Sequence, residues 1–175
     1  MFKIRFSNLE GRNMTEKPIA LVTGGAQGIG FACAEAIAAD GAQIVLADVN
    51  DRGVKDAAEK LAGDTVAYVC DMGEPDQIEA LFGKIETDLG SISILVNNAG
   101  IALPTDFLEV SHANFQKVLN VNLTGSFLAT QRAAKSMIAS GIEGAIVNMS
   151  SVNAQVAIPS IAAYCASKGW VMQLT

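Results

Sequence analysis

The sequence predicts one α/β domain with a doubly wound parallel sheet, and three observations carry this prediction. Strand-like runs of Val, Ile and Leu alternate with helix-like runs from Pro18 onward. The strand-like runs are continuously apolar, as in parallel strands that helices cover on both faces. A glycine-rich turn follows the first of them. The length of 175 residues suits a single domain.

Each element is predicted from its local pattern. Strands are expected at residues 19–22, 43–48, 66–70, 92–96 and 144–149. Helices are expected at residues 31–39, 51–61, 74–89 and 111–140, and a last helix begins near Ser160 and continues to Thr175. In the helix at 74–89, apolar side chains recur with a period of about 3.6 residues. These βα units predict a Rossmann-like fold, a three-layer α/β/α sandwich.

Both ends of the chain depart from this pattern. Residues 1–16 resemble nothing that follows, so we expect an N-terminal extension before a folded domain at residues 17–175. Either the extension is flexible or Met14 is the natural start. The last helix stops without a cap, which suggests a fragment. The strand at 144–149 would then be an exposed apolar edge, which is a hazard for aggregation.

The composition argues against several classes of protein. A net charge of −6 disfavours nucleic acid as a partner, because its binders present basic surfaces. No apolar run approaches the roughly 20 residues that span a bilayer, and the first residues lack a signal core. We therefore expect a cytoplasmic protein with no membrane partner. The three cysteines are widely spaced and His112 is the only histidine, so we expect no disulfide, no metal site and no catalytic histidine.

The glycine-rich turn covers residues 23–30, with the sequence Thr-Gly-Gly-Ala-Gln-Gly-Ile-Gly. Glycines let the backbone turn tightly and let phosphates approach, and the helix that follows offers unpaired N–H groups at its positive end. The turn therefore predicts a phosphate-bearing cofactor. The residues expected to contact it are Gly24, Gln27, Gly28, Ile29 and Gly30.

Asp48 refines this prediction, because it ends the second strand 18 positions after Gly30. An acid about 20 residues after the glycine turn binds the ribose 2′-hydroxyl of a dinucleotide. A carboxylate also repels a 2′-phosphate, so the sequence favours NAD over NADP. Two alternatives stay open: Asp48 merely forms a turn, or Arg52 pairs with a 2′-phosphate.

Chemistry is expected at the ends of the fourth and fifth strands. Tyr164 and Lys168 lie four positions apart, on one face of the last helix. A free tyrosine is a poor base because its pKa is about 10, and a neighbouring cation favours the phenolate. The Ser151 hydroxyl could hydrogen-bond a substrate oxygen, unless it only forms a turn. Asn122 lies within an apolar helix, where a buried side-chain amide needs hydrogen-bond partners. A structural hydrogen bond and a role in the site both explain an asparagine at this position.

Taken in order, these motifs resemble the short-chain dehydrogenase/reductase family. They are the glycine turn, the Asn-Asn-Ala-Gly run at 97–100, Asn122, Ser151 and the Tyr164-x-x-x-Lys168 pair. Ser151 precedes Tyr164 by 13 positions, as in the family, and the resemblance extends from about Pro18 to Thr175. No single motif is decisive, but the ordered set is specific.

The resemblance implies a catalytic tetrad. Tyr164 would be the general acid/base while a hydride moves to or from the nicotinamide. Lys168 would favour the phenolate and hold the nicotinamide ribose, Ser151 would orient the substrate oxygen, and Asn122 would hold a water in a proton relay. The resemblance also implies cofactor contacts from Asp71 and Met72 to adenine, and from Asn98, Ala99, Gly100, Tyr164 and Lys168 along the cleft.

The implied function is an NAD-dependent oxidoreductase acting on a small secondary alcohol or ketone, a homodimer or homotetramer when full length. Family members continue with further strands and a segment that covers the substrate, and this sequence lacks both. A catalytically inactive dinucleotide-binding module is therefore the alternative. A nucleotide-binding methyltransferase ranks third, because it would have no use for Tyr164 and Lys168.

Overall fold

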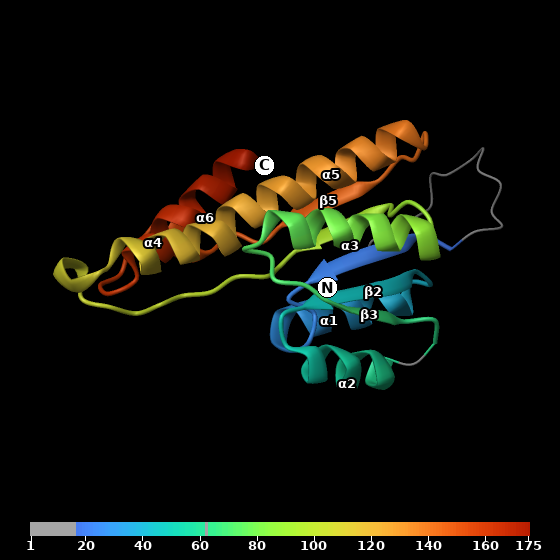
Figure 1. Cartoon of the computed structure of the whole chain (residues 1–175), viewed down its shortest axis with the longest axis horizontal. Coiled ribbons are helices and arrows are strands. Elements are labelled where there is room, and N and C mark those ends of the chain that lie inside the picture. The colour runs from blue at the N-terminus through green and yellow to red at the C-terminus, as the bar shows by residue number, and fades with distance from the viewer. Residues whose placement is uncertain (1–16, 62) are drawn as a thin grey trace.

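A computed structural model describes residues 17–61 and 63–175 (Figure 1). The predictions for residues 1–16, including the choice of Met14 as a start, lie outside the described residues. The chain forms a five-stranded parallel sheet with the strand order β3-β2-β1-β4-β5. The predicted doubly wound α/β architecture is thereby confirmed.

The strands are short, and the inner ones are buried on both faces. They are β1 (Ile19–Thr23), β2 (Gln43–Asp48), β3 (Val66–Val69), β4 (Ile94–Asn97) and β5 (Ala145–Asn148). Leu21 of β1 pairs in register with Val45 of β2 and Leu95 of β4, and all three side chains are fully buried. This burial explains the continuous apolar runs, because side chains on both faces of these strands meet helices.

Alternate side chains of the strands pack into two separate cores. On one face, Val22 and Leu46 pack with residues of α1 (Gly28–Ala39) and α2 (Asp51–Leu61). On the other face, Leu21 and Val45 pack with residues of α3 (Pro75–Asp88) and α5 (Ser126–Ala139). Figure 1 shows these helix pairs on opposite sides of the sheet, which is the predicted three-layer sandwich.

The helical region predicted at 111–140 is present at 112–139, but it is not a regular α-helix throughout. It consists of α4 (His112–Leu119), a π-helical turn η2 (Asn120–Gly125) and α5. Gly125 lies so close to the carbonyl of Met72 that an added Cβ would collide with it. The wider turn and this glycine bring the helix against the connection between β3 and α3.

Smaller corrections concern the ends of elements. The third strand ends at Val69 rather than residue 70, the fourth occupies Ile94–Asn97 rather than 92–96, and the fifth is Ala145–Asn148. The last helix, α6, spans Ala162–Leu174, and it begins after Ser160 because that residue has a φ of 66°. Short 3₁₀ turns, η1 (Phe107–Glu109) and η3 (Val152–Ala154), lie in the loops before α4 and α6.

One edge strand of the sheet is β5, as predicted, and the other is β3. The side chains of β5 alternate in exposure and Val147 is 44% exposed. On α5 and α6, the rings of Phe127 and Trp170 contact edge to face with their centroids 6.4 Å apart, and both are partly exposed. The homo-oligomer stays a prediction. Among the described residues, no helix has the length and apolar character that crossing a membrane requires.

Candidate active site

The glycine turn is fastened to the end of β4 by hydrogen bonds. The Thr23 hydroxyl accepts from the backbone N–H groups of Asn98 and Ala99, both at 3.1 Å. The Asn98 amide donates to the carbonyls of Thr23 (3.1 Å) and Gly24 (3.0 Å). The Asn-Asn-Ala-Gly run therefore holds the turn in shape from the neighbouring strand.

The geometry requires glycine at several positions of the turn, and Gly24 and Gly30 illustrate two different reasons. Gly24 has a φ of 63°, a conformation that side chains other than glycine rarely adopt. An added Cβ at Gly30 would collide with the Gly24 carbonyl. Gly30 thus allows the first turn of α1 to pack under the glycine turn, and it does not line the cavity described next.

A cavity of about 540 Å³ opens at the carboxyl ends of β1 to β4, the edge where ligands bind in doubly wound sheets. Most of the predicted cofactor residues line it: Gly24, Gln27, Gly28, Ile29, Asp48, Asp71, Met72, Asn98, Ala99 and Gly100. Gly30, Tyr164 and Lys168 are not among its lining residues. Residues that the sequence analysis missed also line it: Val49, Cys70, Ile101, Lys117 and Val121.

The N-terminus of α1 faces this cavity through Gly28 and Ile29. Its N-cap residue, Gln27, makes no side-chain cap hydrogen bond, and the first turn carries no acidic side chain. An added Cβ at Gly28 would meet nothing within 4 Å. Uncapped N–H groups beside open space at the positive end of a helix fit the phosphates of a dinucleotide.

Asp48 forms a turn and also lines the cavity. One carboxylate oxygen accepts from the Ala26 N–H at 3.1 Å, and the other accepts from the Asn50 N–H at 3.0 Å. These bonds fix the carboxylate between the glycine turn and the end of β2. The Arg52 side chain is 92% exposed, lies within 3.8 Å of Asp56, and is not a lining residue.

The turn after β3 is also fixed by its own side chains. Asp71 accepts from the Gly73 N–H at 2.8 Å, and its own N–H donates to Gln77 at 2.9 Å. The Cys70 thiol is buried, and burial together with the charge of Asp71 raises its pKa to about 11. A thiol with this pKa stays protonated and unreactive at neutral pH. All three cysteines are free, and only Cys70 is fully buried.

Asn122 is fully buried in the π-helical turn η2 and joins three segments of the chain. Its amide oxygen accepts from the Ile101 N–H at 2.8 Å, and its amide nitrogen donates to the Ile101 carbonyl at 2.9 Å. The amide nitrogen also donates to the Ser167 hydroxyl of α6 at 3.0 Å. The loop after β4, the turn η2 and the helix that carries Tyr164 and Lys168 are therefore linked.

Lys168 lies where β5, α6 and the Asn-Asn-Ala-Gly run meet. Its ammonium donates to the Met149 carbonyl and lies 5.8 Å from the centroid of the Tyr164 ring. An added Cβ at Gly100 would lie 3.6 Å from the same ammonium. Lys168 is only 5% exposed, and this burial lowers its pKa. The ammonium thus lies between Tyr164 and a lining residue of the cavity.

Ser151 follows β5 and caps the 3₁₀ turn η3. Its hydroxyl accepts from the Asn153 N–H at 3.2 Å, and among the described residues no hydrogen bond joins it to Tyr164. The neighbouring Ser150 hydroxyl donates to the Lys168 carbonyl at 2.9 Å. In the described part of the chain, no three His, Cys, Asp or Glu side chains are grouped as metal ligands.

Comparison with known proteins places this geometry in a family. The family model described as short chain dehydrogenase matches residues 18–175. A D-threitol dehydrogenase of Mycolicibacterium smegmatis is 42% identical over 153 residues, which cover 86% of this chain and 58% of that protein. An NAD-dependent glycerol dehydrogenase of Listeria innocua is 38% identical over 164 residues, which cover 93% of this chain and 63% of that protein.

A solved structure is similar over the same region. A crystal structure described as a betaketoacyl-ACP reductase matches with a TM-score of 0.84 and 32% identity, covering 91% of this chain and 65% of that one. The chain thus spans less than two thirds of the length of these relatives. The family model nevertheless covers every motif that carried the resemblance, and the chain belongs to the short chain dehydrogenase family.

Proposed function

We propose that the full-length protein is an NAD-dependent oxidoreductase that interconverts a small secondary alcohol and its ketone. One observation carries the proposal: the Lys168 ammonium lies beside the Tyr164 ring and next to Gly100 of the cavity. A proton-transfer pair adjoining a nucleotide-sized cavity is the arrangement that this reaction needs. The two named dehydrogenase relatives act on polyols, which supports a polyol-like alcohol as the substrate class.

NAD is the cofactor that the lining residues support best. The uncapped N-terminus of α1 suits the pyrophosphate, and Asp48 has lone pairs left for a ribose diol after its two backbone bonds. The exposed Arg52 lies outside the lining, which argues against a 2′-phosphate partner. Bound NAD would supply the hydride acceptor for alcohol oxidation and the donor for ketone reduction.

Four side chains would share the proton chemistry. Tyr164 takes the hydroxyl proton of the alcohol as the carbon–hydrogen bond breaks, and it returns a proton in the reverse direction. Lys168, whose ammonium lies 5.8 Å from the centroid of the Tyr164 ring, would act beside that side chain and hold the nicotinamide ribose. Ser151 orients the substrate oxygen. Asn122, in the π-helical turn η2, holds a water of the proton relay through its backbone or its amide oxygen, because its amide hydrogens bond within the fold.

The test of this proposal is Tyr164→Phe in the full-length protein. We expect turnover of a polyol panel to fall at least about a hundredfold, which is the usual contribution of a general acid/base, while NAD affinity is unchanged. Steady-state kinetics and calorimetry measure the two quantities. Tyr68→Phe is the matched control, because Tyr68 does not line the cavity. The Tyr68 hydroxyl donates a hydrogen bond to Asp88 at 2.8 Å. Full turnover by the Tyr164→Phe variant would refute the proposed role.

The alternative, a dinucleotide-binding module without catalysis, is favoured for this 175-residue chain by its length alone. The chain covers 58–65% of the compared relatives, while the cavity for the cofactor is built from its own residues. Binding of NAD by this chain with no turnover of the same polyol panel would support the module. The full-length protein in the same assay separates the two functions.

A further inference from the structure

One charged side chain of the cavity has no role in the function proposed so far. Lys117 lies near the end of α4 and lines the cavity together with Asp48 and Asp71. It is the one cationic residue among the described lining residues. The cofactor cavity therefore carries two carboxylates and a single ammonium.

The position of Lys117 along the cavity follows from its helix. Lys117 and Val121 lie four residues apart and both line the cavity, so one row of side chains faces it. A Cβ added at Gly73 would lie 3.1 Å from a methyl group of Val121. This row thus lies beside the turn of Asp71 to Gly73 that follows β3. Lys168, in contrast, adjoins Gly100 at the end of β4.

The Lys117 ammonium is available to a ligand. The side chain is exposed, and it makes no hydrogen bond or ion pair with any residue in the part of the chain that the structure describes. Lys17 pairs with Asp64, Lys55 pairs with Asp51, and Lys135 donates to Gln131. All three donor hydrogens of Lys117 can therefore point at an acceptor in the cavity.

We propose that Lys117 binds the adenosine-monophosphate half of the dinucleotide by donating a hydrogen bond to one of its acceptors. The inference rests on the proposed function, because it assumes that the cavity holds a dinucleotide. It adds a donor to the cavity that the carboxylate of Asp71 also lines, so that the cavity offers both a donor and an acceptor.

The experiment measures the dissociation constants of NAD, AMP and nicotinamide mononucleotide by calorimetry. The variants are Lys117→Met and, as the matched loss of one positive charge far from the cavity, Lys135→Met. For Lys117→Met we expect the dissociation constants of NAD and AMP to rise at least about tenfold, as for the loss of one hydrogen bond from a charged donor. The constant for nicotinamide mononucleotide stays unchanged, and Lys135→Met changes none of the three.

Each contrary outcome has a distinct meaning. If Lys117→Met binds NAD and AMP as tightly as the wild type, or weakens nicotinamide mononucleotide equally, this inference is overturned and the proposed function stands. If the full-length wild-type protein binds no dinucleotide, the proposed function fails and the inference fails with it. Equal melting temperatures of the variants, expected for exposed lysines, separate a binding effect from unfolding.

Discussion

Asn122 uses its side-chain amide entirely within the fold. Its oxygen and nitrogen satisfy both backbone groups of Ile101, and its second amide hydrogen bonds the Ser167 hydroxyl. The side chain has no hydrogen left for a ligand, so any relay through Asn122 must use its backbone or a second contact on the amide oxygen. The residue is therefore a structural link between loop and helix, whatever its part in catalysis.

Asn122→Ala should be strongly destabilising. The substitution leaves both backbone groups of Ile101 and the hydroxyl of buried Ser167 short of partners, at an expected cost of roughly 2–4 kcal/mol in the free energy of unfolding. Urea denaturation measures it. Asn120→Ala is the control, because it removes one bond, from Gln116, and should cost less than about 0.5 kcal/mol. Equal losses for both variants would contradict the structural link.

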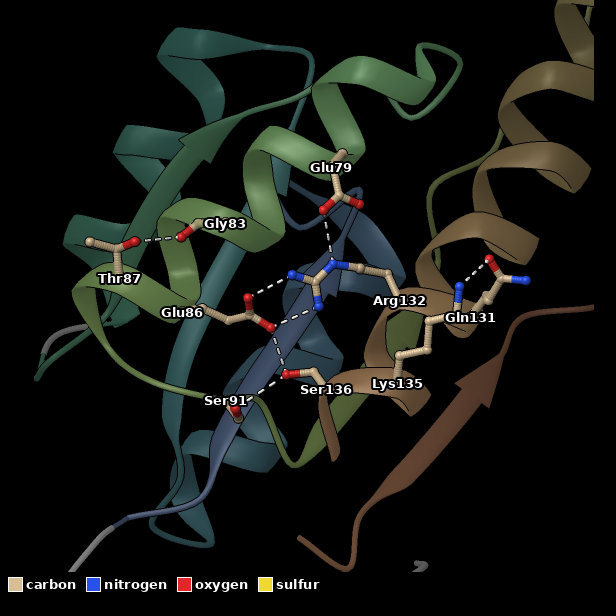
Figure 2. A network of polar contacts seen from close by, with 9 residues as sticks. All are labelled: Glu79, Gly83, Glu86, Thr87, Ser91, Gln131, Arg132, Lys135 and Ser136. Carbon is tan, nitrogen blue, oxygen red and sulfur yellow. Dashed lines mark hydrogen bonds and ion pairs between the residues drawn. The ribbon is translucent and has the colours of Figure 1, made fainter. Parts of the chain in front are cut away.

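At the scale of elements, α3 and α5 are joined by a polar network on the face of the sheet that also carries the larger core. Figure 2 shows Arg132 of α5 between Glu79 and Glu86 of α3. Two nitrogens of the guanidinium contact the two carboxylate oxygens of Glu86 at 2.8 and 2.6 Å, and Ser136 donates to Glu86 at 2.6 Å. Such a bidentate pair fixes the relative position of two helices better than a single contact does.

This network predicts a pH dependence of stability. The hydrogen bond from Arg132 is the main cause that lowers the pKa of Glu86, although partial burial opposes it. A depressed pKa in the folded state contributes stability above the unfolded pKa of about 4.3, and the contribution is lost as the pH falls through the folded value. Glu86→Gln should therefore cost about 1 kcal/mol at pH 7 and progressively less below pH of about 4.

Denaturation of both proteins between pH 7 and pH 3 measures this difference. Glu79→Gln serves as the control, because the Glu79 side chain is 69% exposed and makes one contact with the guanidinium. It should have little effect at any pH. A constant difference between wild type and Glu86→Gln across the range would show that the charge of Glu86 does not contribute.

At the scale of the whole molecule, the sheet ends at an open strand. The outer edge of β5 pairs with no strand among the described residues, and Val147 on it is 44% exposed. An apolar unpaired edge is a template for pairing with another chain. We expect Val147→Lys to reduce the concentration-dependent self-association of this 175-residue chain, as measured by light scattering.

Val152→Lys is the matched control, because Val152 is 73% exposed but lies in η3 outside the sheet. It should leave self-association unchanged. If both variants reduce association equally, added charge alone is responsible and the edge of β5 is not. If neither does, association proceeds through another surface.

Local sequence patterns were sufficient to predict the inner strands of the sheet. Residues 43–48 were predicted as a strand and form β2 with the same bounds, because the four residues between Gln43 and Asp48 are apolar and buried, as in a strand covered on both faces. The helical region expected at 111–140 is present, but its π-helical turn η2 was not predicted. In that turn Asn122 bonds Ile101 and Ser167, which are both distant from it in sequence. Lys117 was missed for a similar reason, since an exposed helical lysine carries no local signal for a cavity.

The sequence by itself determined the family, the parallel α/β sandwich and the identity of most lining residues of the cavity. These follow from short-range patterns: apolar strands, a glycine turn with a helix behind it, and polar residues at strand ends. Only the tertiary structure decided which side chains are committed to the fold and which are free. Asn98 and Asn122 are bonded within the protein, whereas Lys117 is unpaired in the described chain and lies at the cavity. Hydrogen bonding is settled by distances between segments, and a linear sequence does not contain them.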